Sequence, residues 1–114
     1  MKILVISPSD DCCGPMAAAF LRDYSPRLEV VSAGRNPSSS VVPMMVTAMK
    51  ECLIDLSGYQ PKNVSDFDLS AFDAVYDCPD PPFPATMEEA RHVRDFIKNE
   101  AYLFFRKNAI NSQL

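Results

Sequence analysis

The chain has 114 residues, of which 47% are hydrophobic and 23% charged, and its net charge is −4. This length and composition predict one globular domain over residues 1–114 and exclude disordered, collagen-like and coiled-coil chains. The acidic excess, without a basic patch, argues against nucleic-acid binding. No apolar run approaches the roughly 18 residues of a membrane span, and the apolar start lacks a signal-peptide cleavage region. We therefore expect no membrane contact and a cytoplasmic location.

The first third of the chain alternates strand and helix signals. Lys2–Ile6 is a continuous apolar, β-branched run, which is typical of a buried parallel strand. A polar loop, Ser7–Gly14, follows, and Pro15 suits the first turn of a helix. Leu28–Ala33 then predicts a second strand.

The middle of the chain predicts a second helix and a third strand. Pro43 opens the helix, and its apolar residues recur every three or four positions, as a buried stripe requires. The stripe consists of Met45, Ala48, Met49, Cys52 and Leu53. Val64–Leu69 indicates a short helix, and Phe72–Cys78 has the composition of a third strand.

A proline-rich segment separates the third strand from a long terminal helix. Pro79–Pro84 has too many prolines for regular structure. Thr86 and Glu89 have the spacing of a capping box, which predicts a helix from about Met87 to Arg106. Its apolar stripe is Ala90, Val93, Ile97, Ala101 and Phe104. His92 lies off this stripe, so we expect it at the surface.

The alternation of strands and helices predicts an α/β fold of three layers. We expect a short parallel sheet of three or four strands, with right-handed crossovers and helices on both faces. Ligands of such sheets bind beyond the carboxyl ends of the strands. The loop Ser7–Gly14 lies there, so it is the first candidate for a functional site.

The four cysteines are Cys12, Cys13, Cys52 and Cys78. Without a signal peptide, we interpret them as thiols rather than as a disulfide framework. They show no Cys-x-x-Cys spacing, and the sequence has a single histidine, so we predict neither a metal site nor a cofactor.

The order and spacing of several short motifs resemble the low-molecular-weight protein tyrosine phosphatases and their relatives, the thioredoxin-coupled arsenate reductases. The matching segments are Met1–Ile6, Pro15–Phe20, Ser32–Gly34, Pro43, Ala48–Glu51, Ile54–Ser57, Phe72–Val75, Asp80-Pro81 and Val93–Ile97. The resemblance covers nearly the whole chain and implies the fold of that family.

The resemblance also implies an anion-binding loop formed by Ser7, Pro8, Ser9, Asp10, Asp11, Cys12, Cys13 and Gly14. In the family this loop has a nucleophilic cysteine, then an asparagine, an arginine and a serine. Here Ser7 stands at the nucleophile position and Asp10 at the asparagine position. Cys13 stands at the arginine position and Gly14 at the serine position. Asp80 matches the general acid of the family.

These substitutions predict loss of the family's chemistry. A serine hydroxyl is not ionised at neutral pH, and no histidine lies near Ser7 in the sequence to act as its base. Cys13 supplies no positive charge, and Asp10 and Asp11 add negative charge around the loop. We therefore expect a non-catalytic binding or regulatory protein whose ligand is a protein or a small oxyanion. Arg35 is the nearest candidate for a replacement cation, but we expect it to be solvated.

Two alternatives remain open. One is a thiol-redox protein, because the resemblance places Cys78 where the arsenate reductases carry a redox cysteine, and Cys12 and Cys13 lie at a helix N-terminus. A Cα distance below about 7 Å from Cys12 or Cys13 to Cys78 would favour this alternative. The other is residual phosphatase activity.

The resemblance also indicates that a fourth strand is missing, since Cys78 runs almost directly into Asp80-Pro81. Val75 would then lie at a sheet edge, and exposed edges invite pairing with other chains. We expect either the segment Pro79–Pro84 or a second subunit, in a homodimer, to cover this edge.

Overall fold

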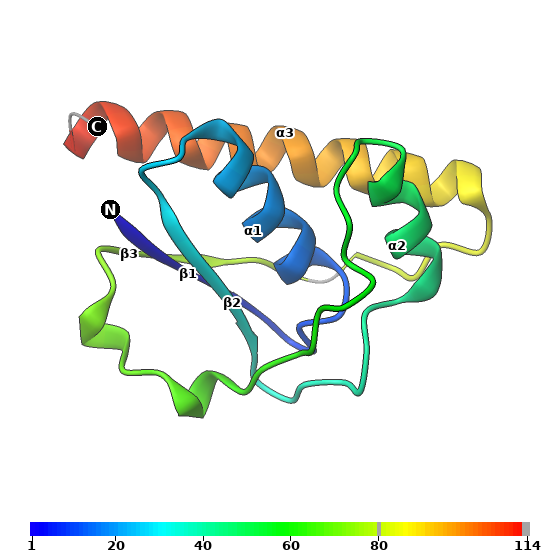
Figure 1. The fold of residues 1–114 in the computed structure, drawn as a ribbon, viewed down its shortest axis with the longest axis horizontal. Helices are drawn as coiled ribbons and strands as arrows, with labels where there is room; N and C mark the ends of the chain where they lie inside the picture. Colours follow the sequence, from blue (N-terminus) through cyan, green and yellow to red (C-terminus); the bar gives the residue numbers. More distant parts are fainter. Residues whose placement is uncertain (80, 113–114) are drawn as a thin grey trace.

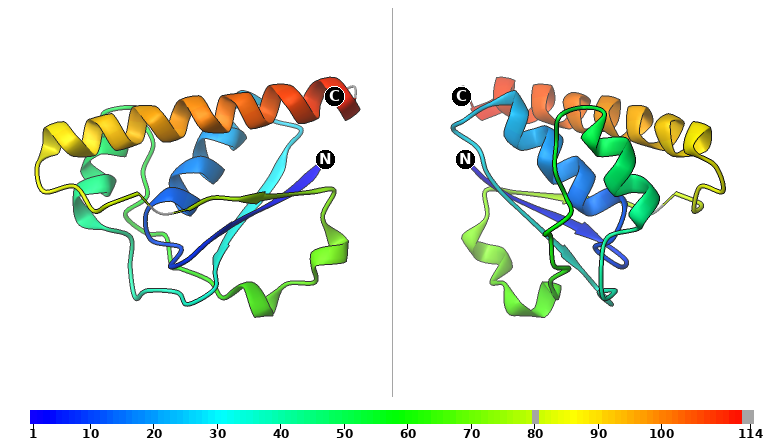
Figure 2. Two further views of the ribbon diagram at one scale, coloured as in Figure 1. Left: turned by 180° about the vertical axis from the view of Figure 1, so that it is seen from behind. Right: turned by 45° about the vertical axis from the view of Figure 1, so that its right-hand side comes forward.

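The computed structural model describes residues 1–79 and 81–112. Its sheet has three parallel strands, β1 (Lys2–Ser7), β2 (Glu29–Gly34) and β3 (Ala74–Asp77), in the order β2-β1-β3. Three α-helices, α1 (Cys13–Tyr24), α2 (Pro43–Lys50) and α3 (Met87–Ser112), lie on one face of the sheet, and Figures 1 and 2 show α3 running along its whole length. Two short 3-10 helices, η1 (Val64–Asp66) and η2 (Leu69–Ala71), lie on the other face. The expected parallel α/β fold with helices on both faces is confirmed, with three strands among the described residues.

The central strand β1 separates two apolar clusters. Ile3 and Val5 point toward the α-helices, where they join the main core with Met16, Phe20 and Ile97. Leu4 and Ile6 point the other way and pack with Ala33 and with partly buried aromatic residues below the sheet. Because both faces of β1 are covered, the continuous apolar run at the start of the chain becomes a buried strand.

The third helix begins where the capping box predicts. The Thr86 hydroxyl accepts a hydrogen bond from the Glu89 N–H at 3.1 Å, and the Glu89 carboxylate accepts from the Ala85 N–H at 2.6 Å. Ala90, Ile97 and Ala101 are buried against the core, and His92 is exposed, as expected. Among the helices of the described residues, none combines the length and apolar character needed to cross a bilayer.

The second helix ends earlier than its apolar pattern indicates. Met45, Ala48 and Met49 are buried as predicted, but Cys52 is only half-buried and Leu53 is 96% exposed. Leu53 has a positive φ of 63°, and the N–H groups of Leu53 and Ile54 bond back to the carbonyls of Lys50 and Met49. This is the hydrogen-bond pattern of a Schellman motif, which turns the chain away from the helix axis. The prediction that Leu53 belongs to the buried stripe is therefore wrong.

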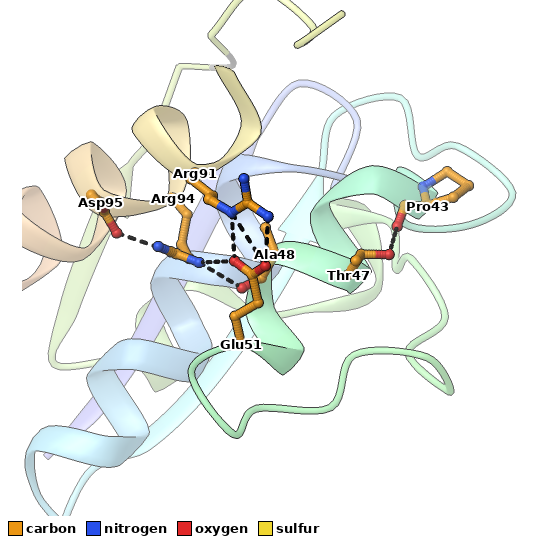
Figure 3. Close-up of polar contacts among 7 residues, drawn as sticks. All are labelled: Pro43, Thr47, Ala48, Glu51, Arg91, Arg94 and Asp95. Carbon is orange, nitrogen blue, oxygen red and sulfur yellow. Dashed lines mark hydrogen bonds and ion pairs between the residues drawn. The ribbon is translucent and has the colours of Figure 1, made fainter. Parts of the chain in front are cut away.

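A cluster of charged side chains joins the end of α2 to α3 (Figure 3). Glu51 accepts hydrogen bonds from Arg91 and Arg94, and Arg94 also donates to the Ala48 carbonyl and to Asp95. The two guanidinium groups lower the pKa of Glu51 to about 2. These contacts hold the C-terminal end of α2 against α3.

The third strand forms an edge of the sheet. No strand among the described residues lies beyond it, and Val75 is 44% exposed. Cover of this edge by Pro79–Pro84 or by a second subunit stays a prediction.

Candidate functional site

The loop between β1 and α1 lies at the carboxyl end of the central strand, as predicted. Its carbonyls accept hydrogen bonds from the following segment of the chain. The pairs are Arg35 N–H to Ser7, Asn36 N–H to Pro8, Ser38 N–H to Ser9 and Val42 N–H to Asp11, at 2.8–3.0 Å. In a trans peptide the N–H points opposite to the carbonyl, so the N–H groups of Ser9, Asp10 and Cys12, which follow the carbonyls of Pro8, Ser9 and Asp11, turn to the other side of the loop. This backbone arrangement is suited to holding an electron-rich atom.

Ser7 supplies that atom from within the chain. Its side chain is fully buried, and its Oγ accepts a hydrogen bond from the Asp10 N–H at 3.1 Å. A Cβ atom added to Gly14 would lie 2.7 Å from the Ser7 Oγ, which is too close for a real contact. The loop therefore closes tightly around Ser7, and a side chain at residue 14 would require the Ser7 hydroxyl to move.

Gly34 allows the loop to approach the end of β2. A Cβ atom there would lie 2.9 Å from the Asp10 nitrogen and 2.9 Å from the Ser9 carbonyl carbon. Close packing against the loop thus explains the glycine of the Ser-Ala-Gly motif at the end of this strand. Only glycine leaves room for the backbone of the loop.

Asp10 ties the loop to a distant part of the chain. It has a positive φ of 51°, a conformation that aspartate tolerates better than most residues. Its carboxylate accepts hydrogen bonds from the Tyr59 hydroxyl and from the Lys62 N–H. Its second oxygen, Oδ1, is buried without a hydrogen-bond partner. Burial raises the pKa of Asp10, although the bonds to Tyr59 and Lys62 act in the opposite direction.

Asp11 has a comparable role on the other side of the loop. It is 5% exposed, and its Oδ2 accepts a hydrogen bond from the Ser38 hydroxyl at 2.7 Å. Both aspartates thus direct one carboxylate oxygen to a neighbouring segment that braces the loop. Sequence reasoning singled out the two carboxyl groups but missed their partners Tyr59, Lys62 and Ser38, which come from segments without a motif.

Cys13 forms a disulfide with Cys78. Their Cα atoms are 6.3 Å apart and 65 residues separate them in the sequence. The interpretation of all four cysteines as thiols is therefore wrong for this pair, because the start of α1 and the end of β3 meet at one edge of the sheet. Cys12 is buried and Cys52 half-buried, and both lie outside this disulfide. The two bonded cysteines are only 3% and 2% exposed.

A pocket of about 430 Å³ lies beside the disulfide. Apolar side chains, the two cysteines and two acidic residues from α1, β3, the proline segment and α3 form its walls. Its lining consists of Cys13, Tyr76, Asp77, Cys78, Pro79, Pro81, Phe96, Ile97 and Glu100. The general-acid candidate Asp80 lies outside the described residues.

No arginine or lysine enters the loop among the contacts of the described residues. Arg35 instead forms an ion pair with Asp77 at 3.0 Å, and both side chains are more than half exposed. It is thus a surface residue, as expected, although its backbone N–H contacts Ser7. In the part of the chain that the structure describes, no group of three or more acidic, cysteine or histidine side chains could hold a metal ion.

Comparison with known families identifies the scaffold that carries this loop. The family model described as low molecular weight phosphotyrosine protein phosphatase matches residues 2–77, which include the whole loop and all three strands. The chain belongs to this family. Among curated protein sequences, none matches it.

Solved structures of family relatives share the fold at low sequence identity. An arsenate reductase in a phosphate-binding state is 20% identical, with a TM-score of 0.80 over 93% of this chain and 97% of that one. A low molecular weight protein tyrosine phosphatase from T. tengcongensis is 17% identical, with a TM-score of 0.81 over 94% and 99%. An arginine phosphatase variant in which serine replaces a cysteine, and whose active-site serine is phosphorylated, is 18% identical, with a TM-score of 0.80 over 94% and 95%.

Proposed function

We propose that this chain is a phosphatase-like domain that does not turn over phosphate esters and acts as a binding or regulatory protein. The observation that carries the proposal is the disulfide of Cys13, the residue that aligns with the family's arginine. A sulfur in a disulfide carries no charge and cannot grip phosphoryl oxygens. No guanidinium among the described contacts replaces it, since Arg35 pairs with Asp77.

The surroundings of Ser7 support the same proposal. Its hydroxyl accepts a hydrogen bond from the Asp10 N–H, and within the described part of the chain no histidine or lysine is among its hydrogen-bond partners. A serine nucleophile needs a general base to remove its proton. Loss of a single donor to a reacting oxyanion typically reduces turnover by about 10²- to 10³-fold, so loss of both nucleophile and clamp predicts background activity.

The phosphorylated serine of the arginine phosphatase variant suggests a second measurement, which is whether Ser7 becomes phosphorylated. In that relative, an active-site serine has accepted a phosphoryl group that remains attached. If Ser7 kept a comparable reactivity, incubation with a phosphate ester would leave a stable phosphoserine rather than multiple turnovers. We expect none here, because the loop is closed around the buried Ser7 hydroxyl.

Turnover of p-nitrophenyl phosphate tests the proposal. We expect background rates for wild type, Ser7→Ala and Ser7→Cys, and no phosphoserine by mass spectrometry. The triple variant Ser7→Cys, Asp10→Asn, Cys13→Arg restores the nucleophile, the neutral bracing group and the cation, so it is the variant most able to regain turnover. Wild-type turnover that Ser7→Ala abolishes would overturn the proposal.

A second candidate function is thiol–disulfide exchange through Cys13 and Cys78. The 6.3 Å separation of their Cα atoms and the disulfide itself favour it. In this function Cys13 and Cys78 form their disulfide while a disulfide compound or protein accepts two electrons and two protons, so that its S–S bond breaks into two thiols. A thiol donor later reverses the step. Thiol counting after cycles of oxidation and reduction tests it, with Cys52→Ala as a control outside the pair. A native protein that never forms this disulfide under oxidising conditions would overturn this candidate.

A further inference from the structure

We propose that an incoming apolar thiol enters the pocket beside the disulfide, attacks the sulfur of Cys78 and forms a mixed disulfide there. This proposal rests on the second candidate function and adds the reacting sulfur, the direction of the exchange and the class of thiol. The thiolate sulfur bonds to the Cys78 sulfur while the bond between Cys78 and Cys13 breaks. The incoming sulfur is oxidised, and Cys13 takes the electron pair and leaves as a thiolate.

The two sulfurs differ in their backbone surroundings. Cys13 is the first residue of the 12-residue helix α1, so its sulfur lies at the positive end of the helix dipole. Cys78 follows the last residue of β3, and its N–H is already bonded to the Ile6 carbonyl at 2.7 Å. A strand end offers no comparable dipole. The better leaving thiolate in an exchange is the one that its surroundings stabilise, which here is Cys13.

The two aspartates of the loop are the groups that oppose this preference. The Asp11 Oδ2 accepts a hydrogen bond from the Ser38 hydroxyl, while the Asp10 Oδ2 accepts from the Tyr59 hydroxyl and the Lys62 N–H. These donors offset part of the negative charge of the two carboxylates. The helix terminus therefore decides which sulfur leaves.

The pocket determines which thiol reaches the disulfide. Both cysteines are almost completely buried, and both line the pocket of about 430 Å³, so the pocket is the route to them. Its size is within the range of small-molecule sites. Tyr76, Phe96 and Ile97 form apolar walls, and Phe96 is 62% exposed at the surface. An aromatic or aliphatic substituent on the thiol gains contact with these walls.

Negative charge at the pocket disfavours thiols whose substituents are anionic. Glu100 and Asp77 both line it, and Asp77 is paired with Arg35 in an exposed ion pair. Burying an anion next to Glu100 costs free energy, because like charges repel in a region of low dielectric. The site therefore favours a thiol with an uncharged apolar substituent over glutathione, whose substituent carries carboxylates.

Mapping of the mixed disulfide tests the reacting sulfur. The oxidised protein is mixed with benzyl mercaptan, quenched with acid after short times and alkylated with N-ethylmaleimide. Fragment ions then separate Cys12 from Cys13. We expect the benzyl adduct on Cys78 and the maleimide on Cys13, in excess over the reverse pattern by about tenfold. The reverse pattern, or an oxidised protein that gives no adduct, would overturn the inference.

A second measurement does not depend on trapping an intermediate. In Cys78→Ser and Cys13→Ser, one sulfur of the pair remains, and its thiolate absorbs in the ultraviolet. We expect the thiolate of Cys13 to appear at lower pH than that of Cys78. The opposite order would overturn the inference even though the disulfide forms, whereas absence of the disulfide in wild type would overturn the second candidate function as well.

Comparison of thiols tests the pocket. At equal thiolate concentration, we expect benzyl mercaptan to reduce the disulfide about tenfold faster than 2-mercaptoethanol, because its ring gains apolar contact. Phe96→Ala should remove most of this advantage, and Glu100→Gln should accelerate glutathione alone. Glu88→Gln, on the same helix but in a different pocket, is the matched control. Equal rates for all thiols in wild type would overturn the assignment of the pocket.

Discussion

Two carboxyl groups of this domain have opposite surroundings. Asp10 is buried in the loop, where its hydrogen-bond donors are a hydroxyl and a backbone N–H, and burial raises its pKa. Glu51 lies at the surface between α2 and α3, where two arginines lower its pKa to about 2. The guanidinium groups of Arg91 and Arg94 thus join α2 to α3 at Glu51. The carboxylates of the loop accept instead from neutral hydroxyl and N–H groups.

Among the substitutions that we consider, one at the close contacts of the loop should reduce the free energy of unfolding most. Gly34→Ala places a Cβ atom 2.9 Å from two backbone atoms of the loop, so the backbone has to shift. We expect the free energy of unfolding to fall by about 2–3 kcal/mol, measured by urea denaturation. Gly58→Ala is the matched control, because no atom lies within 4 Å of its added Cβ. Equal stability of the two variants would show that the loop does not depend on this approach.

Substitutions in the charged cluster between α2 and α3 should reduce the free energy of unfolding less. Arg94 is only 12% exposed and contacts Ala48, Glu51 and Asp95, whereas Arg91 is 46% exposed and contacts Glu51. We expect Arg94→Ala to lower the free energy of unfolding by about 1 kcal/mol, because a buried carbonyl loses a charged donor. Arg91→Ala should have less effect, as is usual for exposed ion pairs. The reverse order in thermal melting would contradict this view of the cluster.

The two carboxyl groups should give pH dependences of opposite sign. Because the folded-state pKa of Asp10 is raised above 3.8, its favourable contribution is complete below that pH and is lost as pH rises through the folded pKa. Asp10→Asn removes this loss while keeping an acceptor for Tyr59. We expect the stability of Asp10→Asn relative to wild type to increase as pH rises from about 4 toward 7. A constant difference in urea denaturation over this range would contradict it.

Glu51 should give the opposite slope and the smallest effect. Its folded pKa of about 2 lies below the ordinary value of 4.5, so its contribution is present above pH 4.5 and is lost as pH falls toward 2. Glu51→Gln should therefore be less stable than wild type at neutral pH, with a difference that shrinks in acid. Salt should reduce the difference at neutral pH, because the group is exposed. Insensitivity to both acid and salt would exclude an ionic contribution.

The sequence predicted the fold well because it depends on local patterns. The apolar run Lys2–Ile6 and the capping box at Thr86 both specify their elements within a few residues, and the structure confirms them. Leu53 was assigned to a buried stripe because periodicity alone does not reveal where a helix turns off its axis. The C-terminal hydrogen bonds of α2 decide that point.

The candidate site was predicted only in part because its contacts join distant segments. The loop position follows from the strand–helix order. By contrast, the partners of Asp10 at Tyr59 and Lys62 come from a turn region without periodic signal. The pairing of Cys13 with Cys78 spans 65 residues, and nothing in the spacing of the cysteines specifies it. Only the meeting of α1 and β3 at one sheet edge brings the two together.

The central position of β1 also has a consequence during synthesis. This strand comes first in the chain but has neighbours on both sides, β2 and β3. It can pair with β2 as soon as Glu29–Gly34 has left the ribosome. Its other edge stays unpaired until Ala74–Asp77 has been synthesised. At ordinary translation rates this interval lasts on the order of a few seconds. During that time the nascent chain exposes an apolar strand edge, which is the stage at which a chaperone would recognise it.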